Sequence, residues 1–62
     1  MLLSPEERER FARYCLVQAD SYSGTARQLK ELNVPMLMVQ REEGIAAAYR
    51  IVADHLLLVE DA

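Results

Sequence analysis

Sixty-two residues with a mass of 7.1 kDa are enough for a single small domain. Chains below about 70–80 residues rarely bury enough apolar surface to be comfortably stable alone. Yet 52% of the residues are hydrophobic, which is rich for so short a chain. With one cysteine, Cys15, an internal disulfide is excluded, and with one histidine, His55, a zinc cluster within a single chain is not expected.

The charge balance argues against a dedicated nucleic-acid binder. Seven basic and ten acidic residues give a net charge of −3, whereas affinity for nucleic acid comes largely from neutralising phosphates. The apolar stretches are far shorter than the ~20 residues of a membrane span, and the opening residues lack the apolar segment of a secretory signal. An unpaired cysteine fits a reducing compartment. We therefore expect a cytoplasmic protein without a membrane segment.

The chain opens with a helix-start signal. Ser4 suits the N-cap, Pro5 suits the first helical position, and Glu7 completes a capping box. Apolar or small residues then recur three or four positions apart, at Phe11, Cys15, Ala19, Tyr22, Ala26 and Leu29. This spacing predicts one helix over residues 5–32. The weak helix formers of residues 20–25 leave an alternative open, in which the helix breaks near Gly24 and restarts at Thr25.

Asn33, Val34 and Pro35 form the clearest punctuation in the sequence. Asparagine tolerates the left-handed conformation that ends many helices, the residue before a proline is extended, and proline fits the first turn of a new helix. The expected connection is therefore the two residues 33–34, followed by a second helix over 35–60. Two helices of similar length joined so tightly predict an antiparallel hairpin.

The second helix has the strongest periodicity in the chain and a wide apolar arc. One row repeats every seven residues, at Met38, Ile45, Val52 and Val59, and a flanking row contains Leu37, Gly44, Ile51 and Leu58. His55 and Leu56 lie in the same arc. We expect the first row, with His55 and Leu56, to face the stripe of the first helix.

The width of this arc predicts the architecture. A single neighbouring helix covers only one side of it, so a lone hairpin leaves a row such as Leu37, Ile51 and Leu58 in water. We expect a second copy of the chain to cover that row in a two-fold four-helix bundle, or an unidentified protein to do so. Gly44 and the alanines 46–48 would let another backbone approach closely.

No residue pattern indicates catalysis, a cofactor or a metal. His55 is interpreted as a core or core-edge imidazole; the alternatives are a pH-sensitive seam or a metal ligand shared across a dimer. Cys15 is interpreted as a small buried hydrophobe rather than a nucleophile. Arg8, Arg10 and Arg13, interleaved with Phe11 and Tyr14, form the best candidate for RNA contact. Neighbouring glutamates cancel their field, which favours a solvated, salt-bridged face.

The plan of a short acidic hairpin that dimerises resembles the Rop family of small RNA-binding regulators. The resemblance covers the whole chain in architecture and implies a homodimeric four-helix bundle. Family members present a polar and aromatic row from the first helix to RNA, and Phe11, Tyr14 and Gln18 fit such a row. The lysines expected beside it are missing, because Lys30 is the sole lysine. No functional residue is carried over from the family.

The sequence thus predicts an all-α hairpin that is not an enzyme and acts through protein–protein contact as a homodimer. The alternatives are a Rop-like RNA-binding regulator and an obligate subunit of a larger complex. The residues expected in the core or the interface are Phe11, Cys15, Tyr22, Leu29, Leu37, Met38, Ile45, Ile51, Val52, His55, Leu56, Leu58 and Val59. Replacing Ile45 or Val52 by Asp is predicted to abolish folding and assembly together, because the charge would be buried unpaired.

Overall fold

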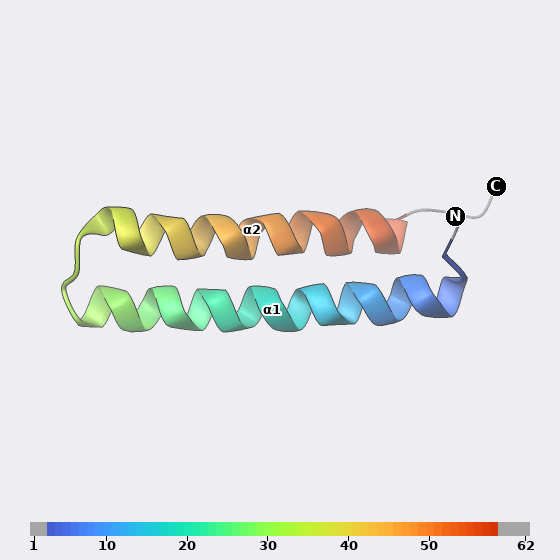
Figure 1. Cartoon of the computed structure of the whole chain (residues 1–62), viewed down its shortest axis with the longest axis horizontal. Helices are drawn as coiled ribbons and strands as arrows, with labels where there is room; N and C mark the ends of the chain where they lie inside the picture. Colours follow the sequence, from blue (N-terminus) through green and yellow to red (C-terminus); the bar gives the residue numbers. More distant parts are fainter. Residues whose placement is uncertain (1–2, 59–62) are drawn as a thin grey trace.

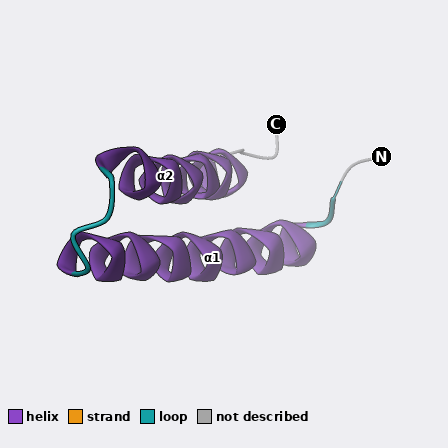
Figure 2. Cartoon of the chain, turned by 60° about the vertical axis from the view of Figure 1, so that its left-hand side comes forward, coloured by secondary structure: helices purple, strands orange, loops and turns teal. Residues whose placement is uncertain are grey.

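The computed structural model describes residues 3–58, which form two helices, α1 (Pro5–Glu31) and α2 (Met36–Leu58). The helices lie side by side and antiparallel along the molecule, with the connection at one end (Figures 1 and 2). The principal extents of 48 × 17 × 14 Å are those of a rod one helix pair wide. The predicted hairpin is confirmed, while the predicted end of the second helix at residue 60 lies outside the described residues.

The predicted start of α1 is present in full. The Glu7 backbone N–H donates to Ser4 Oγ at 3.2 Å, and the Ser4 backbone N–H donates to Glu7 Oε1 at 3.0 Å. Each bond satisfies a backbone donor that has no partner within the helix. The Ser4 backbone N–H that donates to Glu7 Oε1 draws the pKa of Glu7 below its ordinary value, because it stabilises the carboxylate, and the Ser4 side chain and the charge of Arg10 lower this pKa further.

α1 is continuous through Gly24, so the alternative with a break there is excluded. The weak segment keeps its helical hydrogen bonds, and the Thr25 hydroxyl donates to the Ser21 carbonyl at 3.1 Å. That bond satisfies the hydroxyl on the preceding turn while the helix continues. Tertiary contact with α2 outweighs the low propensity of these residues.

The connection between the helices is a complete Schellman motif. Asn33 has a φ of 58°, the left-handed conformation predicted for it. Its backbone N–H donates to the Lys30 carbonyl at 3.2 Å, and the Val34 N–H donates to the Leu29 carbonyl at 3.5 Å. These are the two bonds that close a helix ending in a left-handed residue. The helix bounds differ from the predicted ones by one residue at this connection, since Leu32 is the C-cap and α2 begins at Met36.

The seam between the helices is made of small side chains. Along α1 the fully buried residues are Ala12, Cys15, Ala19 and Ala26, and along α2 they are Val39, Ala46 and Ala53. Three of the four in α1 and all three in α2 repeat every seven residues, which is the period of a coiled-coil seam. Larger side chains, Tyr49 and Leu56, flank the cluster of Ala12, Cys15 and Ala53.

This seam corrects the expected inner face of α2. The row of Met38, Ile45 and Val52 lies one position before Val39, Ala46 and Ala53, which turns it by about 100° around the helix. Met38 and Val52 are exposed and Ile45 is half-buried, while His55 is exposed. Alanine takes the inner position because its small side chain lets two backbones approach closely, whereas a column of Ile, Val and Met would hold them apart.

Candidate functional site

The two flanks of the seam carry different chemistry. The first flank, called the bridged face, holds the rows four positions after the seam residues: Leu16, Ser23 and Lys30 of α1, and Glu43, Arg50 and Leu57 of α2. The second flank, called the open face, holds the rows one position before them: Phe11, Gln18 and Thr25 of α1, and Met38, Ile45 and Val52 of α2. In an antiparallel helix pair, equivalent flanking rows lie on the same side.

Polar contacts cross the bridged face. Lys30 Nζ lies 3.3 Å from Glu43 Oε2, and Arg50 Nη2 donates to Ser23 Oγ at 2.9 Å. Arg50 Nη2 also lies 3.7 Å from Asp20 Oδ1. The charged side chains are about half exposed or more, so each contact contributes little to stability, and together they tie the two helices across one flank.

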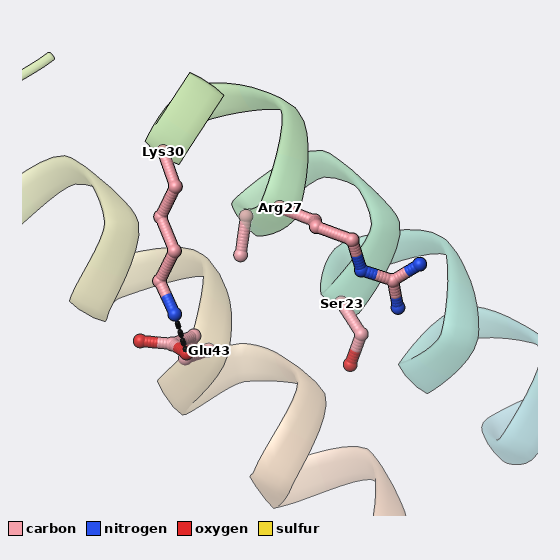
Figure 3. A pocket seen from close by; sticks show the side chains of 5 residues that line it. Ser23, Arg27, Lys30 and Glu43 are labelled. Carbon is pink, nitrogen blue, oxygen red and sulfur yellow. Dashed lines mark hydrogen bonds and ion pairs between the residues drawn. The ribbon is translucent and has the colours of Figure 1, made fainter. Parts of the chain in front are cut away.

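A small pocket on the bridged face is lined by Ser23, Ala26, Arg27, Lys30 and Glu43. Figure 3 shows Lys30 reaching across to Glu43, while Arg27 extends along α1 and away from that carboxylate. Its lysine and its carboxylate neutralise each other. The ion pair therefore closes the pocket, and Arg27 is the remaining charged side chain in its lining.

The open face has a different composition. A groove of about 210 Å³ is lined by four residues of α2, Ile45, Ala48, Tyr49 and Val52. Tyr49 stacks on Tyr22 of α1 with ring centroids 5.8 Å apart and an interplanar angle of 16°. Burial raises the pKa of Tyr49 above its ordinary value near 10, and the neighbouring Tyr14, Tyr22 and Cys15 raise this pKa further.

The outer side of α2 continues the apolar surface beyond the groove. Leu37 is 77% exposed, Ile51 is 69% exposed and Leu58 is 77% exposed. These are the residues that the width of the apolar arc predicts a lone hairpin to leave in water. A row of such large aliphatic side chains is more than the single exposed hydrophobes that are normal on a monomer.

The other residues predicted for the core or interface divide between the seam and the surface. Cys15 is fully buried, Tyr22, Leu29, Ile45 and Leu56 are half-buried, and Phe11 is exposed. Val59 lies outside the described residues. Ala12, Val39, Ala46 and Ala53 are core residues that were not predicted; the signal that marks them is the recurrence of small residues at a spacing of seven, Ala12, Ala19 and Ala26 in α1 and Ala46 and Ala53 in α2.

The aromatic and arginine candidates for RNA contact lie near the start of α1. Phe11 and Tyr14 meet edge to face with centroids 6.2 Å apart, and both are about half exposed. Arg13 forms an ion pair with Glu9 one turn before it. This arrangement is the salt-bridged, solvated face that the local charge balance predicts.

Among residues 3–58, no group of three or more His, Cys, Asp and Glu side chains is placed to hold a metal ion. Neither of the two helices in this part of the chain is long and apolar enough to cross a membrane. Comparisons of the chain with protein-family models, with curated proteins and with solved structures find no match.

Proposed function

We propose that this protein is a non-enzymatic helical hairpin that self-associates and acts through protein–protein contact. The observation that carries the proposal is the unpartnered apolar surface of α2, from the groove beside Tyr49 to the row of Leu37, Ile51 and Leu58. A seam of alanines buries little area per residue, so most of the large aliphatic side chains remain available for a partner.

The accessible surface supports the same proposal. The chain exposes 5069 Å², whereas a compact monomer of 7.1 kDa exposes about 4,100 Å². The excess is about 1,000 Å², and each partner of a standard stable interface buries about 800 Å². The excess reflects the elongated shape of a single helix pair, and it is comparable in size to the area that one partner of such an interface buries.

The structure changes the expected effect of a charge at the open face. Val52 is 44% exposed in the single hairpin, so a carboxylate at this position remains in contact with water there. We expect Val52→Glu to keep the helices and to abolish association. Val17→Glu is the matched control, because Val17 is 63% exposed on the side of α1 that faces away from the seam.

The experiment is size-exclusion chromatography with light scattering, combined with circular dichroism, on the unmodified chain and both variants. The expected result is a dimer for the unmodified chain and for Val17→Glu, and a helical monomer for Val52→Glu. A compact, monodisperse monomer of the unmodified chain at high concentration would contradict the proposal.

A further inference from the structure

The groove on the open face has the geometry of a helix-packing site. Its lining residues, Ile45, Ala48, Tyr49 and Val52, stand at positions i, i+3, i+4 and i+7 of α2. Four residues with this spacing form the hole that receives one side chain of a neighbouring helix in knobs-into-holes packing. The lining belongs to α2 alone, so the hole faces out from the hairpin toward the place where another helix would lie.

The character of the groove favours a second copy as its occupant. In a two-fold interface the same patch serves both partners, so residues near the axis meet their own copies. A charged side chain at that point would meet a like charge, and each chain already carries a net charge of −3. The four lining residues carry no acidic or basic side chain, so two copies of this patch can pack together without like charges meeting.

The position of the groove along the helix favours an antiparallel pairing. Ala48 stands next to the midpoint of α2 (Met36–Leu58), so an axis at this level overlaps two copies of the helix over nearly their whole length. Gly44 lies one turn earlier, and a Cβ placed on it would meet nothing within 4 Å. Small side chains at both levels let a second backbone approach.

We infer that a second copy of the chain lays its α2 antiparallel across this groove, with the two-fold axis beside Ala48. This inference rests on the proposed self-association and names its partner and its surface. Ile45 then packs near Val52 of the partner subunit, the two Ala48 residues face each other, and the bridged face with Lys30 and Glu43 stays on the outside.

Cysteine cross-linking tests the position of the axis. Disulfides need Cα atoms about 4.4–6.8 Å apart, a distance that two copies of residue 48 satisfy at the proposed axis. Ala47→Cys is the matched control, because Ala47 is also an exposed alanine of α2 and lies about 100° further around the helix, on the side away from the groove. Both variants are made in a Cys15→Ala background and, in parallel, with the buried Cys15 retained.

Under mild oxidation, we expect Ala48→Cys to give a covalent dimer at low protein concentration and Ala47→Cys to remain uncross-linked. Equal cross-linking of the two variants, or none, in a chain that is dimeric by light scattering would overturn the inference and leave the proposed self-association standing. A chain that is monomeric in the same measurement would overturn both. Circular dichroism of each variant establishes that it is folded before oxidation.

Discussion

Tyr22 and Tyr49 form an offset stack across the hairpin, with their ring centroids 5.8 Å apart. Each lies at the border between the alanine seam and the open face, and both are half-buried. Aromatic pairs of this kind contribute about 0.5–1.5 kcal/mol beyond the area they bury.

A double-mutant cycle measures this stack. Tyr22→Leu and Tyr49→Leu should each lower the free energy of unfolding, and the double variant should lose less than the sum by about 0.5–1.5 kcal/mol. Urea denaturation followed by circular dichroism gives the three values at one protein concentration. Strictly additive losses would show that the rings do not interact.

The raised pKa of Tyr49 predicts a loss of stability at alkaline pH. A phenol whose pKa is higher in the folded state than in the unfolded chain binds its proton more tightly when folded. The contribution of the protonated Tyr49 phenol to the free energy of unfolding is complete below the unfolded pKa near 10, and it disappears as pH rises through the folded pKa. Thermal unfolding from pH 9 to 12 should show this decline, and Tyr49→Phe should reduce it. An equal decline in the variant would assign the effect to other groups.

Because the seam is made of small residues, we expect the free energy of unfolding to depend strongly on side-chain size at the seam positions. Ala46→Leu adds three carbon atoms at a position that is 1% exposed, and overpacking of this kind costs about 1–3 kcal/mol of unfolding free energy. Ala47→Leu makes the same change one position later on an exposed surface, where the expected change is within about 0.5 kcal/mol. Equal effects of the two substitutions in urea denaturation would refute the assignment of the seam.

The capping box predicts the cost of losing Ser4. Ser4→Ala removes the acceptor of the Glu7 N–H, which should lower the unfolding free energy by about 1 kcal/mol. Ser21→Ala, in the exposed middle of α1, serves as the control and should change stability by only a few tenths of a kcal/mol in the favourable direction. Equal responses to the two substitutions would mean that the cap contributes nothing.

The same box predicts a dependence on acid pH. Because the pKa of Glu7 is lowered on folding, its contribution is present above the ordinary pKa of 4.5 and is lost as pH falls through the folded pKa. Glu7→Gln should remove this part of the acid dependence, as measured by denaturation between pH 2 and 6. An unchanged acid profile in the variant would count against a role for the Glu7 carboxylate.

Local signals in the sequence predicted the hairpin well. Ser4, Pro5 and Glu7 define the start of α1, and Asn33 with Pro35 defines its end, because each acts through the backbone of its immediate neighbours. These effects depend on a few consecutive residues and on no distant contact. The half-buried Tyr22, Leu29 and Leu56 also followed from helical spacing.

The inner face of α2 could not be read in the same way. When apolar residues surround most of a helix, periodicity shows how wide the apolar surface is but does not show which row faces the neighbouring helix. Hydrophobicity alone ranks Ile45 and Val52 above Ala46 and Ala53. The structure selects the alanines because the distance between two helix axes depends on side-chain volume. The recurrence of alanine at a spacing of seven in both helices, rather than the spacing itself, carried that information.

The alanine seam also leaves the axial alignment of α1 relative to α2 to be set partly by other residues. Alanine has no side-chain rotamers and forms a low ridge, so it interlocks neighbouring turns of α1 and α2 less than a larger side chain does. The Tyr22–Tyr49 stack and the contacts of Lys30 and Arg50 with the opposite helix join the two helices on the two flanks of the seam and contribute to their axial alignment, together with the short connection at Asn33. Residues that flank the seam therefore help to oppose a shift of one helix along the other by a turn.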